Sequence, residues 1–138
     1  MTAPFSGGCA CGAARYECSA EPIAAANCHC RDCQHATGGP FASVLLVPRD
    51  AVHVTGEVKY HEVKGDSGQP IRRGFCPNCG SRLLSQPSGM PVELMGITMG
   101  SLDNPSLYQP SMDIYTSSAQ PWDFMNPELP KFPKMPPM

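Results

Sequence analysis

Hydrophobic and polar residues alternate over short stretches of the chain, which is the pattern of half-buried β-strands. In AARYEC, residues 13–18, the side chains of Ala14, Tyr16 and Cys18 fall on one face and the charged side chains fall on the other. FASVLLV, residues 41–47, is instead a continuous apolar run followed by a proline, and it also predicts a short strand.

The same reasoning predicts more strands and a single helix. The other strand-like segments are VHVTG (52–56), EVKYHEV (57–63), IRRGF (71–75), RLLS (82–85), VELMGITMG (92–100) and MDIYTSS (112–118). Only RDCQHAT, residues 31–37, looks helical, and it ends at Gly38, a residue type that tolerates a left-handed cap. Many short strands separated by Gly- and Pro-rich turns predict a mainly β fold of short antiparallel sheets, sandwich-like, with one short helix.

The composition changes at residue 120. Residues 120–138 contain six of the 16 prolines, so they form neither a regular helix nor a central strand. We predict a domain over residues 1–119 and an extended Pro-rich tail over 120–138 that packs on its surface. The expected anchors of the tail are Trp122, Phe124, Leu129 and Phe132.

Length, charge and cysteine content narrow the class of protein. A chain of 138 residues fits one domain with a single core. Its net charge of -2 and pI of about 6.0 give no basic surface for nucleic acid or for an anionic membrane. No apolar run is long enough to span a bilayer, and the N-terminus lacks a signal-peptide core, so we expect a cytoplasmic protein. Eight cysteines in a reducing compartment indicate metal or thiol chemistry.

Four of the cysteines have the spacing of a closed structural zinc site. Cys76 and Cys79 lie in a C-P-x-C-G turn, which directs two thiolates at one metal and needs a second pair. Cys9 and Cys11 lie two residues apart, so in extended backbone both side chains leave on the same face. We therefore predict one zinc bound by these four cysteines.

Three more cysteines lie close together at Cys28, Cys30 and Cys33, and we predict a second zinc there with an open fourth position. The pairing is open to permutation, with Cys28 and Cys30 completing the C-P-x-C-G site instead. Cys18 remains, and its place on an apolar strand face predicts a buried, inert thiol. His29 points away from the two cysteines beside it in extended backbone, which favours a supporting or surface role over a ligand role.

A zinc held by three thiolates is suited to thiol chemistry. Soft thiolate ligands make the metal a weak Lewis acid, so it is poorly suited to hydrolysis. An incoming thiol can bind such a site and lose its proton, which gives a nucleophilic sulfur at neutral pH. Extra negative charge calls for nearby cations, and the candidates are Arg31, Arg72 and Arg73.

The chain also carries, in this order, the motifs GGCACG, CHCRDC, FCPNCG, GSLDNPS and QPW. In their order and spacing it resembles the family of glutathione-dependent formaldehyde-activating enzymes and centromere protein V. The resemblance implies a β-dominated fold of the kind found in Rab-accessory zinc proteins, with two zincs per chain. It assigns the structural zinc to Cys9, Cys11, Cys76 and Cys79. It assigns the catalytic zinc, and so the catalytic residues, to Cys28, Cys30 and Cys33.

The function predicted from ligand chemistry and resemblance is that of a zinc-dependent carbon–sulfur lyase acting on a thiol adduct. The implied reaction joins glutathione to formaldehyde, or to a related small carbonyl compound, and gives S-hydroxymethylglutathione in the formaldehyde case. The alternative is a non-catalytic, zinc-stabilised binding module. The expected partner is a small thiol, with no nucleic acid and no membrane, and a homodimer is left open.

Overall fold

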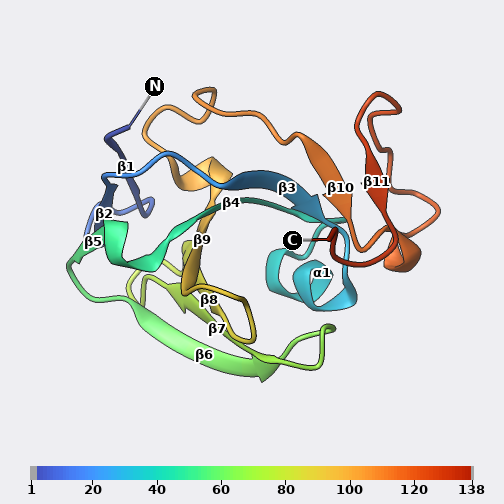
Figure 1. The fold of residues 1–138 in the computed structure, drawn as a ribbon. Helices are drawn as coiled ribbons and strands as arrows, with labels where there is room; N and C mark the ends of the chain where they lie inside the picture. Colours follow the sequence, from blue (N-terminus) through green and yellow to red (C-terminus); the bar gives the residue numbers. More distant parts are fainter. Residues whose placement is uncertain (1–2, 138) are drawn as a thin grey trace.

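The computed structural model describes residues 3–137, which form eleven strands, one α-helix and three short 3-10 turns (Figure 1). The strands are β1 (Phe5–Gly8), β2 (Arg15–Cys18), β3 (Ala24–Cys28), β4 (Ala42–Pro48), β5 (Val52–Thr55), β6 (Lys59–Lys64), β7 (Pro70–Phe75), β8 (Arg82–Pro87), β9 (Leu94–Thr98), β10 (Met112–Ile114) and β11 (Lys131–Phe132). The helix is α1 (Arg31–Thr37), and the turns are η1 (Arg49–Ala51), η2 (Met99–Ser101) and η3 (Thr116–Ser118). The prediction of a mainly β fold with one helix is confirmed.

The strands form two sheets. The small sheet has the order β1-β2-β5 and is antiparallel throughout. The large sheet has the order β11-β10-β3-β4-β9-β8-β7-β6. The large sheet is mixed. Strand β10 runs parallel to both of its neighbours, β3 and β11, and all other neighbouring strands in the sheet are antiparallel to each other. In Figure 1 the small sheet lies at the left, β6 to β8 lie along the bottom, and α1 lies between these strands and β10.

The main core lies between the small sheet and the centre of the large one. On β2 the side chains of Tyr16 and Cys18 are buried, as their alternation with charged residues predicts. On β4 the side chains of Leu45 and Val47 are fully buried in the same core, whereas Val44 and Leu46 on the opposite face are half-buried. Strand β4 is therefore apolar on both faces, which explains its continuous hydrophobic run.

Helix α1 matches the predicted bounds at both ends. Cys30 caps its N-terminus, where its sulfur accepts a hydrogen bond from the backbone N–H of Cys33 at 3.2 Å. Gly38 ends the helix in a left-handed conformation with φ 73, and its N–H bonds to the carbonyl of Gln34. The short helix thus holds one end of the cysteine triplet in a fixed orientation.

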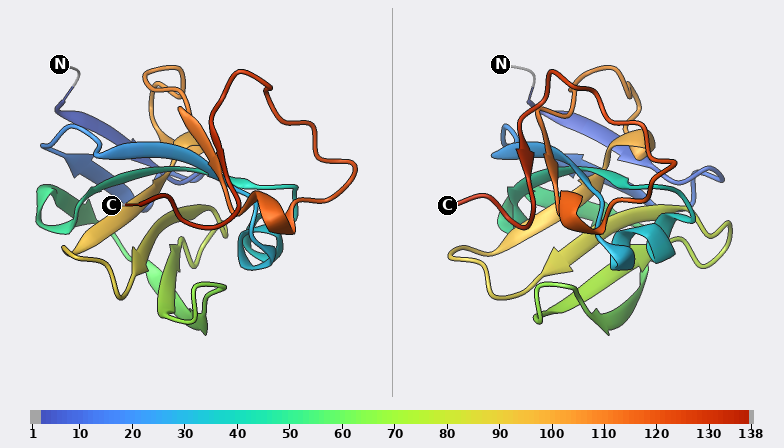
Figure 2. Two further views of the ribbon diagram at one scale, coloured as in Figure 1. Left: turned by 45° about the vertical axis from the view of Figure 1, so that its right-hand side comes forward. Right: turned by 90° about the vertical axis from the view of Figure 1, so that its right-hand side faces the viewer.

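The Pro-rich segment after residue 119 runs beside β10. Figure 2 shows it looping out after β10 and returning as β11, which pairs in parallel with β10. Phe132 packs against a second apolar cluster that includes Ile114. Two of the predicted anchors are wrong, because Trp122 is 67% exposed and Phe124 is 90% exposed. The side chain of Asp123, which lies between them, is buried instead. The domain boundary at residue 119 stays a prediction.

Within residues 3–137 the structure contains no helix of sufficient length and apolarity to cross a membrane.

Candidate metal centres

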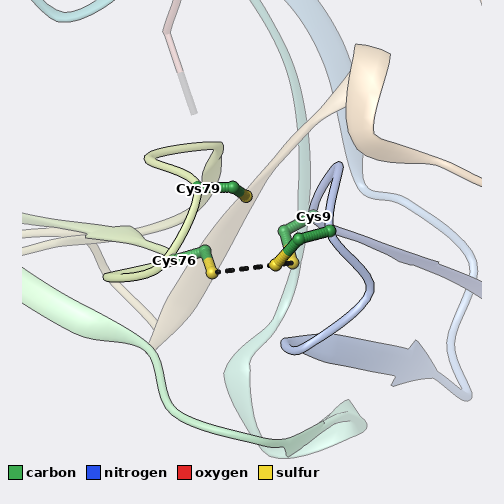
Figure 3. A group of neighbouring side chains, drawn as sticks. Cys9, Cys76 and Cys79 are labelled. Carbon is green, nitrogen blue, oxygen red and sulfur yellow. Dashed lines mark hydrogen bonds between the residues drawn. The ribbon is translucent and has the colours of Figure 1, made fainter.

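The first cysteine cluster joins two loops that are distant in the sequence. Cys9 and Cys11 lie in the loop after β1, and Cys76 and Cys79 lie in the loop between β7 and β8. Figure 3 shows Cys9 on one loop facing Cys76 and Cys79 on the other. All four sulfurs lie within 4.8 Å of one another. The Cys9 and Cys11 sulfurs are 3.5 Å apart, and the Cys11 and Cys76 sulfurs are 3.7 Å apart. Four thiolates around a tetrahedral zinc are separated by about 3.8 Å, so this arrangement fits the metal.

Hydrogen-bond donors surround the sulfurs of this cluster. Cys9 accepts a bond from the backbone N–H of Ala14 at 3.2 Å, which lowers the pKa of the Cys9 thiol. The sulfur of Cys79 lies 3.2 Å from the Ser81 hydroxyl, and this hydrogen bond lowers the pKa of Cys79 to about 5. The amide of Asn78 donates to the sulfur of Cys11 at 3.3 Å. At Cys9 and Cys79 these donors favour the thiolate form that a metal requires.

The second cluster contains three cysteines from one continuous segment. Cys28 ends β3, Cys30 caps α1, and Cys33 lies in the first turn of the helix. Their sulfurs also lie within 4.8 Å of one another, and no fourth His, Cys, Asp or Glu of residues 3–137 joins the group. The four-cysteine and three-cysteine groups therefore have the predicted members and not the permuted ones. Cys18 is buried in the main core and belongs to neither group.

The pKa shifts of the three thiols in the second cluster favour a bound cation. Hydrogen bonding to the other two sulfurs, followed by burial, raises the pKa of Cys28 far above its usual range. The same contacts, with Cys28 and Cys30 as donors, lower the pKa of Cys33 to about 4. The pKa of Cys30 is also raised, so Cys28 and Cys30 keep their protons where three thiolates would repel one another. A bound divalent ion removes this conflict, so the donor set fits a thiophilic metal such as zinc.

One of the three candidate arginines lies at the second cluster. Arg73 on β7 donates to the carboxylate of Asp32 at 2.7 Å and lies 3.7 Å from the sulfur of Cys33. Arg31 instead bonds to Gln34 on its own helix, and Arg72 lies over the ring of Tyr60. Neighbouring residues on a strand point to opposite faces, which explains why Arg73 reaches the cluster and Arg72 does not.

His29 is held away from the metal site by two carboxylates. Its ring is fully buried, and Nε2 lies 2.8 Å from Asp113 while Nδ1 hydrogen-bonds to Asp123. Both ring nitrogens are thus engaged by carboxylates, so neither is available to a metal at the cysteine cluster. The expectation that His29 points away from the sulfurs holds, but a surface position is wrong. Asp113 and Asp123 lie 84 and 94 residues from His29, and no local pattern could have revealed them.

A cavity of about 200 Å³ opens beside the second cluster. Cys28, Cys30 and Cys33 line it, together with Arg73 and Tyr115. Tyr115 has a left-handed backbone conformation with φ 56, which is uncommon for a residue other than glycine and is often retained at functional sites. Burial, followed by the charge of Cys28, raises the pKa of Tyr115, so its phenol stays protonated at neutral pH. The four-cysteine cluster does not line this cavity.

The sequence matches the model of a known protein family over most of its length. The sequence model of the family described as "Glutathione-dependent formaldehyde-activating enzyme" matches residues 4–118, and the chain belongs to this family.

Two known proteins are similar over part or most of the chain. A Penicillium rubens protein named "Putative glutathione-dependent formaldehyde-activating enzyme" is 36% identical over 87 residues, which cover 59% of this chain and 45% of that protein. The chain therefore matches less than half the length of this relative. A crystal structure of a Rhodobacter sphaeroides protein has a TM-score of 0.59 at 20% identity, covering 92% of this chain and 99% of the other. At this identity, the likeness to the Rhodobacter sphaeroides protein shows a shared fold and nothing further.

Proposed function

We propose that the chain catalyses the reversible addition of a thiol, with glutathione first, to a small carbonyl compound such as formaldehyde. The reaction is of the carbon–sulfur lyase type when written in the direction of adduct cleavage. The observation that carries this proposal is the three-cysteine cluster, which lines a cavity and has no fourth protein ligand within residues 3–137. Membership of the formaldehyde-activating family and the name of the Penicillium relative support the choice of reactants.

In this proposal Cys28, Cys30 and Cys33 hold a catalytic zinc. Zinc bound there supplies an open coordination position for a thiol sulfur and lowers the pKa of that thiol. Arg73 offsets the negative charge of the thiolates, because its guanidinium lies 3.7 Å from the Cys33 sulfur. Asp32 keeps that guanidinium in place through its 2.7 Å hydrogen bond.

The reaction forms one carbon–sulfur bond and moves one proton. The substrate sulfur attacks the carbonyl carbon, the carbon–oxygen π bond breaks, and the proton of the thiol ends on the carbonyl oxygen. Tyr115 lines the cavity as a protonated phenol, and it is our candidate for the hydrogen-bond donor to that oxygen. Burial of the cluster keeps bulk water from competing for the carbonyl carbon.

The four-cysteine cluster has a structural role in this proposal. Cys9, Cys11, Cys76 and Cys79 bind a second zinc that clamps the loop after β1 to the loop between β7 and β8. A closed set of four thiolates leaves no position for a substrate. We further propose a cytoplasmic location, where thiols are kept reduced and glutathione is present as a reactant.

The test is the rate at which glutathione exchanges between its free and adduct forms. Formaldehyde and glutathione combine without a catalyst, so two-dimensional exchange NMR is needed with and without zinc-loaded protein. We expect acceleration by the parent protein and by Cys18→Ala, whose thiol lies in the main core. We expect none with Cys30→Ser. If the zinc-loaded parent leaves the exchange rate unchanged, the chain is better described as a zinc-stabilised binding module.

A further inference from the structure

The cavity beside the three-cysteine cluster is far larger than formaldehyde requires, and its surface is mostly apolar. An apolar cavity of about 150 Å³ accommodates benzene. With about 200 Å³, this one has room for a phenyl group or for a chain of roughly six carbons. Its apolar wall includes Val44, Leu46, Ile71, Leu84, Ile114 and Met135.

The apolar residues of β4 that line the cavity are not part of the main hydrophobic core. Leu45 and Val47 on one face are fully buried in the core, so the core is already supplied by that face. Val44 and Leu46 on the other face line the cavity and are only half-buried. An antiparallel strand with water on one face normally carries polar residues there. Apolar side chains kept partly exposed beside a reactive centre indicate contact with an apolar ligand.

A second, basic hollow of about 120 Å³ adjoins the cavity. Its lining contains one acidic residue, Asp32, and four basic ones: Arg73, Arg82, His35 and His61. The two arginines and the acid line both spaces, so the spaces meet at the edge of the cysteine cluster. A ligand that occupies both has carboxylates at its basic end and an apolar group at the other.

Resting on the proposed function, we propose that the carbonyl substrate is an aldehyde with an aliphatic or aryl group of roughly six carbons, and that the thiol carries carboxylates, as glutathione does. The aldehyde substituent occupies the apolar cavity, and the carboxylates of the thiol lie in the basic hollow. The reaction R–CHO + R′–SH → R–CH(OH)–SR′ balances without an oxidant or reductant. The carbon–sulfur bond forms as the thiol proton moves to the carbonyl oxygen.

Binding of inert adduct mimics tests the cavity without any turnover. S-hexylglutathione and S-methylglutathione are thioethers that share the charged part and differ in chain length. Because each buried methylene strengthens binding by up to about fourfold, we expect the hexyl compound to bind at least tenfold more tightly in titration calorimetry. Val44→Thr, nearly isosteric, is expected to weaken hexyl binding severalfold and to leave methyl binding unchanged. The matched control Val54→Thr, on β5 and outside the cavity, is expected to change neither. Equal affinity for the two thioethers overturns the inference.

Exchange NMR with two aldehydes separates this inference from the proposed function. We expect the acceleration over the uncatalysed reaction with glutathione to be at least tenfold larger for hexanal than for formaldehyde. If the acceleration is equal, or larger for formaldehyde, the inference is overturned while the proposed function stands. If neither aldehyde exchanges faster with the zinc-loaded protein, the proposed function fails, and the inference fails with it.

Discussion

The two hydrogen bonds that join the buried ring of His29 to Asp113 and Asp123 give the sharpest prediction about stability. The side chains of His29, Asp113 and Asp123 are at most 1% exposed. His29→Gln leaves two buried carboxylates without the ring that bridges them. Removing one partner of a buried, hydrogen-bonded charged group typically costs about 3–5 kcal/mol, a large part of the 5–15 kcal/mol total stability of a domain. For a chain of this length that corresponds to a fall in Tm of roughly 10–20 °C.

The assay is differential scanning calorimetry of His29→Gln beside the matched control His53→Gln. His53 is exposed on β5, so its replacement is expected to change stability by less than about 0.5 kcal/mol. Zinc content is measured for each variant, because His29 lies between two of the cluster cysteines. Asp123→Asn in the His29→Gln background removes one unpaired charge, so we expect the double variant to be less destabilised than the sum of the singles. A His29→Gln Tm within about 3 °C of the parent, with additive effects in the double variant, would refute this reasoning.

Three further predictions concern the cysteines and one buried tyrosine. Cys79→Ser breaks a clamp between segments 65 residues apart, so it is expected to abolish cooperative folding. Cys33→Ser is expected to lose one zinc and to keep a cooperative melt. Equal loss of stability of the two variants in thermal unfolding contradicts the proposed division of roles. Cys18→Ala is expected to keep two zincs per chain by elemental analysis, and a loss of metal would make this buried thiol a ligand. Burial raises the pKa of Tyr16 to about 12, above its value of about 10 in the unfolded chain. The folded state therefore holds the proton longer, and about 2–3 kcal/mol of stability present below pH 10 is lost between roughly pH 10 and pH 12. Tyr16→Phe is expected to flatten that decline in urea unfolding measured against pH, at a neutral-pH cost of about 1 kcal/mol for the lost 2.6 Å hydrogen bond to Ser101; an unchanged decline assigns it to other groups.

The parts of the fold that could be predicted from the sequence have strong local signals. The C-P-x-C-G turn and its left-handed Gly80, with φ 78, predict two sulfurs facing one metal, and Gly38 predicts the end of α1. The alternation around Tyr16 predicts which side of β2 is buried. These features depend on neighbouring residues and on turn chemistry, so a single sequence contains them.

The parts that were missed depend on tertiary contacts. Strand β3 has the sequence AAANC, which has little intrinsic preference for a strand, and it forms because β4 and β10 pair with it on both sides. Asp123 lies between two exposed aromatic residues, and its carboxylate turns inward because a buried histidine is there to receive it. The cavity had one sequence signal, the continuous apolar run of β4, which indicates a strand covered on both faces.

The most direct test of the central claim is the sulfur coordination of the zincs, measured by X-ray absorption with and without glutathione. A closed site with four thiolates and an open site with three give a mean of 3.5 sulfurs per zinc, the average of the two cluster sizes. We predict that saturating glutathione raises this mean toward four, because its thiolate takes the open position at Cys28, Cys30 and Cys33. A mean that is already four in protein with two zincs, or that stays unchanged when glutathione is added, would contradict an open thiol-binding site.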